Sequence, residues 1–268
     1  MIIKESKLRA IIRSVLAEGI YDPGILKAVF MAGGPGSGKS YTAKVIFGGD
    51  PKKTTALSTA SGLKFVNSDP AFEKFLHDAG ISPKDLGTMS KEEFEAITDP
   101  NDPESIRSRA SAIKKKQQKL FTAPDAKLGV IIDGTGDDYE KLAGKKKALE
   151  SLGYDTYMVF VNTTLEVAQE RNAQRDRTLP EDLVEEIWTD VQKNLGAFQK
   201  LFGASNIQIV DNTVYGPLDK DVSKAVNQFL DAPIKNPIGR KWIEGELGQR
   251  GGGTKRERSK LLGDKRRR

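Results

Sequence analysis

Residues 33–40 constrain the fold of this chain more than any other part of its sequence. They read Gly-Gly-Pro-Gly-Ser-Gly-Lys-Ser, which matches the pattern G-x-x-x-x-G-K-S at every fixed position. An apolar, strand-like segment over 25–31 precedes them, and a segment typical of a helix over 40–47 follows them. A glycine-rich loop between a strand and a helix is characteristic of α/β proteins, so the sequence predicts a parallel sheet with helices packed on it.

The residues of this phosphate-binding loop, or P-loop, are suited to hold a chain of phosphates. Glycines adopt backbone conformations closed to other residues, so several N–H groups can point at one anion. Lys39 adds a mobile positive charge, Ser40 offers a hydroxyl ligand to Mg²⁺, and the following helix N-terminus favours negative charge. The alternative, a turn with no chemical role, is disfavoured by the flanking strand and helix. We therefore predict ATP and Mg²⁺ as ligands, with nucleotide contacts from Gly33, Gly34, Pro35, Gly36, Ser37, Gly38, Lys39, Ser40 and Tyr41.

The composition excludes several other classes of protein. The chain has 268 residues, enough for one sizeable α/β domain with appendages. It has no cysteine and a single histidine, His77, so we expect neither disulfides nor a zinc site built from these residues. It has no run of about 18 apolar residues and no signal-peptide core at its start. We therefore expect a cytoplasmic protein with no membrane partner.

Hydrophobic and charge patterns divide the chain into three parts. We predict an N-terminal amphipathic helix within 1–24, an α/β domain over 25–232 and a flexible, disordered basic tail over 233–268. The tail is rich in proline and glycine and carries 12 Lys/Arg against 4 Asp/Glu, a balance of +8 in a chain whose total is +6. The basic character therefore belongs to the tail, whereas the N-terminal helix either packs on the body or docks on a partner.

Strand-like and helical segments alternate along the body of the chain. This alternation predicts a parallel sheet covered by helices on both faces. A mostly helical insertion over 70–125 is longer than a minimal crossover and could cover a substrate site. The predicted strands, which are apolar and rich in β-branched residues, are 25–31, 63–67, 128–132, 156–161 and 207–210.

Two acidic residues follow predicted strands, at the sheet edge where α/β proteins bind ligands. We assign Asp133 to Mg²⁺, held through water, or to a hydrogen bond with the acceptor substrate; its alternative is a solvated turn. Asp69 is the candidate general base that takes the proton from an attacking hydroxyl group. It could instead cap the helix that begins at Pro70.

Arg171 and Arg175 lie four residues apart and share a helical face. Beside a triphosphate, an arginine can stabilise the transferring phosphoryl group, an effect on the order of 10³ to 10⁵ in rate. The alternative is a solvated basic face, paired with Glu170 or Asp176. We assign both arginines to catalysis and Arg171 also to nucleotide binding. Asn212, after the last predicted strand, is assigned to the adenine.

Taken in order, these motifs resemble the zeta-toxin-like group of P-loop kinases. They are also similar to polynucleotide-kinase and other small-molecule kinase domains. The resemblance spans about 25–230 and is carried by 33–40, by Asn67-Ser68-Asp69-Pro70, by Ile131-Ile132-Asp133-Gly134-Thr135 and by Arg171-x-x-x-Arg175-x-Arg177.

This resemblance implies a five-stranded parallel sheet, ATP as the phosphoryl donor and Asp69 as the base. It also implies that Arg171 and Arg175 are lid arginines around the triphosphate. Zeta toxins phosphorylate a nucleotide-sugar, and many carry glutamate where this chain has Asp133. The N-terminal helix and the basic tail are not part of the family pattern, and nothing in the sequence supports an antitoxin-like partner.

Three functions fit these motifs. The leading prediction is a kinase that phosphorylates a hydroxyl group of a small, nucleotide-sugar-like acceptor. The first alternative is a polynucleotide 5′-hydroxyl kinase, because the basic tail could bind the phosphates of a nucleic acid. The second is an ATP-dependent binding or assembly factor with slow hydrolysis. The sequence does not name the acceptor, because the insertion over 70–125 carries no readable motif.

Overall fold

The centre of the molecule is a five-stranded parallel sheet with the strand order β2-β3-β1-β4-β5. The structure is a computed structural model that describes residues 20–48, 61–175, 177–214 and 216–263. The predicted N-terminal helix lies outside these residues. The five strands are β1 (Lys27–Ala32), β2 (Lys64–Val66), β3 (Val130–Asp133), β4 (Asp155–Asn162) and β5 (Ile207–Asp211).

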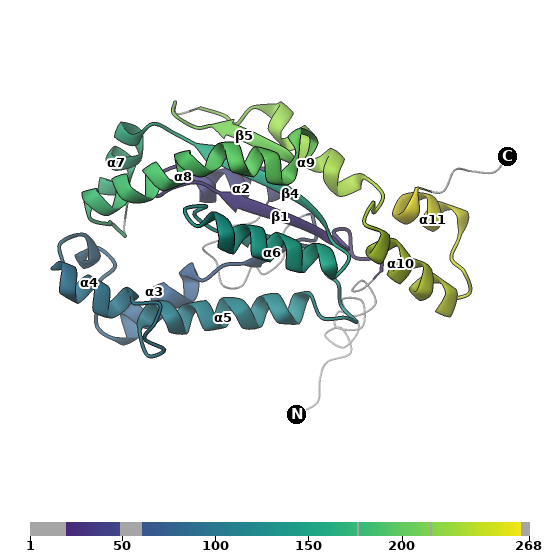
Figure 1. Cartoon of the computed structure of the whole chain (residues 1–268), viewed down its shortest axis with the longest axis horizontal. Helices are drawn as coiled ribbons and strands as arrows, with labels where there is room; N and C mark the ends of the chain where they lie inside the picture. Colours follow the sequence, from purple (N-terminus) through teal and green to yellow (C-terminus); the bar gives the residue numbers. More distant parts are fainter. Residues whose placement is uncertain (1–19, 49–60, 176, 215, 264–268) are drawn as a thin grey trace, which may run out of the picture.

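Helices cover both faces of this sheet, as the alternating sequence pattern predicts (Figure 1). Those in the body are α2 (Lys39–Phe47), α3 (Asp69–Asp78), α4 (Lys91–Thr98), α5 (Ile106–Phe121), α6 (Tyr139–Ser151), α7 (Leu165–Ala173), α8 (Glu181–Phe202) and α9 (Lys220–Asp231). Two short 3₁₀ helices complete it, η1 (Asp85–Gly87) and η2 (Ala204–Asn206). None of the described helices is long and apolar enough to cross a membrane.

The central strand β1 is buried on both faces, because successive side chains of a strand point to opposite sides. Ala28 and Phe30 join the core under α6 and α8. Val29 and Met31 join the core under α2 and α9. The loop that follows β1 therefore leaves the middle of the sheet, with β3 on one side of it and β4 on the other.

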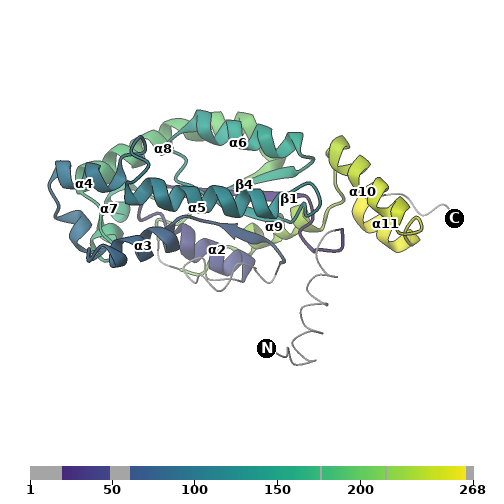
Figure 2. The ribbon, with the colours of Figure 1, turned by 90° about the horizontal axis from the view of Figure 1, so that it is seen from below.

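The insertion between β2 and β3 forms a small core of its own. Phe72 and Leu76 of α3 pack with Leu86 and with Ile106 and Ala110 of α5. Figure 2 shows α3, α4 and α5 gathered beside the β2 edge of the sheet. The predicted helical insertion is therefore a folded unit next to the carboxyl end of β2.

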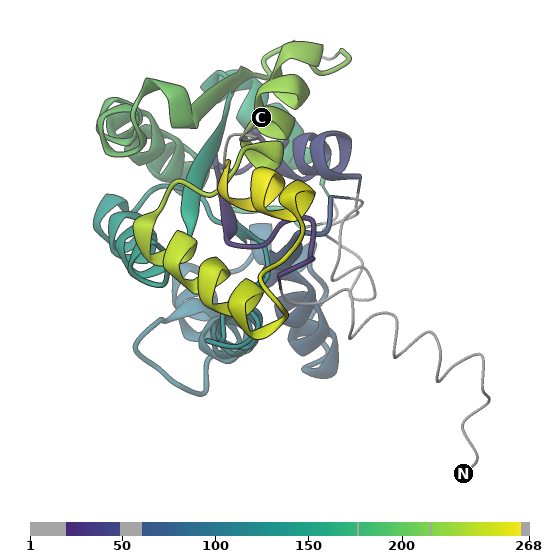
Figure 3. The same ribbon diagram turned by 90° about the vertical axis from the view of Figure 1, so that its right-hand side faces the viewer.

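The prediction of a flexible tail is wrong for residues 233–263. They form α10 (Pro237–Gln249) and α11 (Lys255–Leu262), which lie at one end of the sheet (Figure 3). Ile243, Leu247 and Leu262 are buried in the same core as β1. The prediction failed because proline and glycine here begin and end helices, with Pro237 in the first turn of α10 and Gly263 ending α11 at φ 69°.

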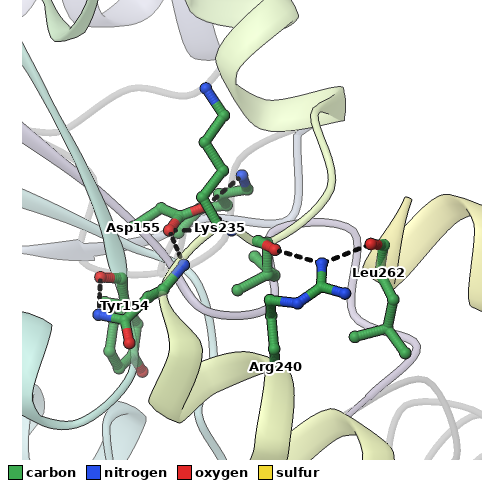
Figure 4. Close-up of polar contacts among 8 residues, drawn as sticks. Tyr154, Asp155, Lys235, Arg240 and Leu262 are labelled. Carbon is green, nitrogen blue, oxygen red and sulfur yellow. Dashed lines mark hydrogen bonds and ion pairs between the residues drawn. The ribbon is translucent and has the colours of Figure 1, made fainter. Parts of the chain in front are cut away.

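Polar contacts fasten this helical pair to the start of β4 (Figure 4). The carboxylate of Asp155 accepts hydrogen bonds from Lys27 Nζ (3.1 Å), from the N–H of Asn236 (2.8 Å) and from the N–H of Lys235 (3.0 Å). Arg240 donates to the main-chain carbonyls of Ile234 and Leu262. The pair therefore docks at the amino ends of the strands, whereas the P-loop lies at their carboxyl ends.

Candidate active site

The P-loop links β1 to α2 in a backbone conformation that requires glycine. Gly36 and Gly38 have φ angles of 74° and 87°, a region that L-residues rarely adopt. A Cβ atom at Gly36 would lie 2.3 Å from the main-chain oxygen of Ala168, and one at Gly38 would lie 2.1 Å from Asn212 Nδ2. α2 begins without a side-chain cap, so the first N–H groups of this helix are available to an anion.

Polar groups around the loop fit a phosphate chain with Mg²⁺. The hydroxyl group of Ser37 is buried and has no hydrogen-bond partner among the described residues. Lys39 Nζ donates to the carbonyl of Gly33 (2.5 Å), and burial lowers the pKa of Lys39 although Asp133 and Asp69 oppose this shift. The described residues hold no group of three acidic or histidine side chains for a metal, so Mg²⁺ would depend on Ser40, Asp133 and the phosphates themselves.

Asp69 opens α3 and faces Arg177. The structure does not support a capping role for Asp69, because the N-cap residue of α3 is Ser68. The Ser68 side chain makes no capping hydrogen bond. Arg177 Nη1 lies 3.3 Å from Asp69 Oδ1. Burial acts to raise the pKa of Asp69, but the charge and hydrogen bond of Arg177, with Arg107 and Lys39, outweigh it and hold this pKa below its usual value. The carboxylate is therefore ionised at neutral pH.

Asp133 ends β3 and lies beside Met31 of β1 in the strand register. Burial raises its pKa, while the charges of Lys39 and Lys114 oppose this rise. Lys114, from the middle of α5, donates a hydrogen bond to the main-chain carbonyl of Asp133. A bound cation would favour the ionised form of this carboxyl group, and its assignment to Mg²⁺ stays a prediction.

The arginines of the segment 171–177 contact different parts of the site. Arg171 Nη1 donates to the main-chain carbonyl of Asn212 (2.7 Å), and Asn212 Nδ2 donates to the carbonyl of Ser37 (2.7 Å). Arg171 and Asn212 therefore lie on the β5 side of the P-loop, and their assignment to the nucleotide stays a prediction. Arg175 and Arg177 instead act electrostatically on Lys39, and burial is the main reason why the pKa of Arg175 is lowered.

Sequence reasoning missed two cationic residues of the insertion. Arg107 stacks over the ring of Phe72, with its guanidinium 4.1 Å from the ring centroid, and its charge acts on Asp69. Lys114 contacts the end of β3. The two residues lie two helical turns apart on α5, so a shared face was the available signal. Of the other assigned residues, Gly33, Gly34 and Pro35 are buried, whereas Tyr41 is 46% exposed. A Cβ atom at Gly34 would lie 3.7 Å from the Cα atom of Trp188.

Comparisons with known proteins agree with this geometry. The family model described as an AAA domain matches residues 29–198. A cytidylate kinase from Ignicoccus hospitalis is 26% identical over 191 residues, which cover 70% of this chain and 89% of that protein.

Solved structures also share this architecture. A chain of the AvrRxo1-ORF1:AvrRxo1-ORF2 complex with sulphate ions has a TM-score of 0.50 at 16% identity, over 77% of this chain and 62% of that chain. This chain thus spans less than two thirds of the AvrRxo1 chain, and at this identity the likeness shows the fold alone. A chain of the PezAT toxin-antitoxin system of Streptococcus pneumoniae gives a TM-score of 0.46 at 14% identity, over 93% of this chain and 96% of that chain.

The predicted α/β fold with a five-stranded parallel sheet is confirmed, and so is the resemblance to zeta-toxin-like P-loop kinases. The roles assigned to single residues stay predictions. Since the family model matches more than half of the 268 residues, this chain belongs to the AAA-domain family, with the fold of P-loop kinase-like proteins.

Proposed function

We propose that this protein is an ATP-dependent kinase that transfers the γ-phosphoryl group to a hydroxyl group of a small-molecule acceptor. One observation carries the proposal. An ionised carboxylate, Asp69, is held by Arg177 within electrostatic reach of the P-loop lysine, Lys39. This carboxylate, at the carboxyl end of β2, suits a general base for the hydroxyl group of an acceptor.

The proposed reaction is an in-line transfer. Asp69 accepts the proton of the acceptor hydroxyl group, the hydroxyl oxygen forms a bond to the γ-phosphorus, and the bond from this phosphorus to the bridging oxygen of ADP breaks. Lys39 leaves the carbonyl of Gly33 to stabilise the charge that develops on ADP. Arg175 and Arg177 stabilise the equatorial oxygens. Mg²⁺, held by Ser40 and Asp133, would neutralise further phosphate charge.

Asp69→Asn tests this assignment. The amide has the same shape but cannot accept the proton, so acceptor-dependent turnover should fall by at least about 100-fold while the affinity for ATP stays within about threefold. Transfer of radiolabelled phosphate from ATP to a panel of small molecules and oligonucleotides measures the first quantity. Titration calorimetry with a non-hydrolysable ATP analogue measures the second.

Asp78→Asn is the matched control, because Asp78 ends the same helix and is exposed, with Lys74 as its partner. Full turnover of Asp69→Asn would disprove the role of Asp69. Phosphate release to water with no acceptor dependence would favour the assembly-factor alternative. Labelling of oligonucleotide 5′ ends alone would favour a polynucleotide kinase.

A further inference from the structure

Asn172 closes the turn that leads from α7 to α8. It lies in the last turn of α7 and is 3% exposed. Its Nδ2 atom donates to the main-chain carbonyl of Leu179 (2.8 Å), and its Oδ1 atom accepts the N–H of the same residue (3.1 Å). A single side-chain amide therefore satisfies both main-chain polar groups of Leu179 and joins the two ends of the turn.

The end of α7 does not depend on this side chain. Gln174 is the C-cap residue of the helix, and its N–H bonds to the main-chain carbonyl of Asn172. The N–H of Arg175 bonds to the same carbonyl (3.2 Å). The main chain of α7 therefore places Arg175 directly. The Asn172 amide reaches beyond this point to Leu179, which precedes Pro180, the N-cap of α8.

Arg177 lies two residues before Leu179 and depends on the closed form of the turn. Its side chain is 13% exposed, and its Nη1 atom lies 3.3 Å from Asp69 Oδ1. Its guanidinium also lies over the ring of Phe72, 5.7 Å from the centroid. An arginine side chain has many rotamers, so its charge is held at one carboxylate only where the main chain that carries it is fixed.

Thr178, between Arg177 and Leu179, seats the turn on the insertion. Its hydroxyl group donates to the main-chain carbonyl of Lys84 (3.1 Å), and a Cβ atom at Gly87 would collide with this hydroxyl group. Figures 1 and 2 both show α7 at the same end of the molecule as α3 and α4. The strands β4 and β2, which precede α7 and the insertion, are separated by β1 and β3. The turn therefore bridges two parts of the fold across the carboxyl edge of the sheet.

We propose that Asn172 is a positioning residue of the phosphoryl transfer, which acts through Arg177 by fixing the main chain two residues beyond it. The inference rests on the proposed kinase function and adds a residue that supports the site from outside it. Asn172 keeps the guanidinium of Arg177 at Asp69. Without its two hydrogen bonds, Leu179 loses these partners, the turn opens, and Arg177 no longer holds the base in line with the γ-phosphorus.

Asn172→Leu tests this role by kinetics. Leucine has a similar size but can form neither hydrogen bond, so acceptor-dependent kcat should fall at least about tenfold, while the affinity for a non-hydrolysable ATP analogue stays within about threefold. In an Arg177→Gln background the same substitution should cost less than about threefold, because its effect passes through Arg177. Losses that multiply in the double variant, or full turnover of Asn172→Leu, would overturn the proposal.

Gln174→Ala is the matched control, because Gln174 is exposed on the same turn and its side chain bonds only to Glu170 (3.3 Å) among the described residues. It should keep the native kcat. Circular dichroism shows whether each variant is folded. Asn172→Ser, which is shorter and leaves Leu179 without at least one partner, is used if Asn172→Leu does not fold. It should lower kcat in the same way, and an unchanged kcat would overturn the proposal.

Titration of the Asp69 carboxyl group by carbon-13 NMR separates this inference from the kinase assignment, because it needs no acceptor. The charged groups that act on this carboxyl group are Arg177, Arg107 of α5, Lys39 of α2 and Asp133 of β3. Burial raises the pKa of Asp69, and Arg177 is the strongest of the groups that lower it. This pKa should therefore rise in Asn172→Leu, as in Arg177→Gln, and not in Gln174→Ala.

The two proposals can fail separately in this titration. An unchanged pKa of Asp69 in Asn172→Leu would overturn the positioning role, whatever the activity of the protein. A raised pKa in this variant, with no transfer from ATP to any acceptor by the native protein, would overturn the proposed function while the role of Asn172 toward Arg177 stood.

Discussion

At the scale of single residues, the contact between Asp69 and Arg177 defines the chemistry available to the site. Two opposing effects act on the carboxyl group, since burial favours its neutral form and the guanidinium favours its ionised form. The effects of Arg177, Arg107 and Lys39 on the pKa of Asp69 together exceed the effect of burial. The resulting carboxylate is a weak base that is ionised at neutral pH. This suits phosphoryl transfer, where positioning contributes more than basicity.

Arg177→Gln should move the acid limb of the pH–rate profile to higher pH. Without the guanidinium, burial is opposed less and the pKa of Asp69 rises, so activity is lost at a higher pH as the solution is acidified. The dependence of kcat/KM on pH measures this shift. Arg109→Gln is the control, because the Arg109 guanidinium stacks over the Phe75 ring (4.4 Å). An unchanged acid limb in Arg177→Gln would contradict the pairing.

At the scale of elements, the P-loop and α6 both place residues in positions that reduce stability. In the P-loop, glycine at positions 36 and 38 permits a close approach to α7 and to Asn212. On α6, Lys141 and Lys145 repel each other and Lys114. Such local costs are common at functional sites, where binding of the ligand compensates for them.

Gly36→Ala should lower the free energy of unfolding by about 1–3 kcal/mol, because its Cβ would clash with the main chain of Ala168 and its φ is positive. Gly34→Ala is the control within the same loop. A Cβ there has its nearest neighbour at 3.7 Å, an ordinary contact, and we expect a change below about 1 kcal/mol. Urea denaturation of the two variants measures both values. Equal losses would show that the conformation at Gly36 is not the cause.

Lys145→Met should stabilise the protein at pH 7, on the order of 1 kcal/mol. The folded chain holds the pKa of Lys145 at about 8, against 10.5 for a free lysine. Between these values the unfolded chain binds more protons, so the stability of the native protein rises with pH over this interval. Urea denaturation from pH 7 to 10.5 should show this rise in the native protein and in Lys147→Met. The rise should be smaller in Lys145→Met, where Lys39 and other lysines with lowered pKa values still contribute, and a rise of equal size there would refute the shift.

At the scale of the whole molecule, the two ends of the sheet have separate roles. The carboxyl ends of the strands carry the P-loop and the acids, and the amino ends receive α10 and α11. The carboxylate of Asp155 joins β1, β4 and the chain leading into α10. Because Ile243 and Leu262 share the core of β1, the helical pair should unfold together with the body.

Ile243→Ala should lower the free energy of unfolding by about 2–5 kcal/mol without adding a second transition. Ile243 is fully buried, so its truncation removes contacts and leaves a cavity in the common core. Ile238→Ala, on the same helix at 51% exposure, should change stability by less than about 1 kcal/mol. Denaturation followed by circular dichroism compares the two. A separate early transition for α10 would show that the pair folds independently.

The sequence by itself determined the P-loop, the strands and the class of fold, because glycine conformation, helix termini and buried apolar runs are properties of neighbouring residues. It also predicted roles for Asp69, Asp133 and Lys39. Only the tertiary structure brought Arg177 to Asp69 across 108 positions and Lys114 to Asp133, and only it packed residues 233–263 on the sheet. These contacts depend on strand order and on burial against distant segments, and a local pattern contains neither.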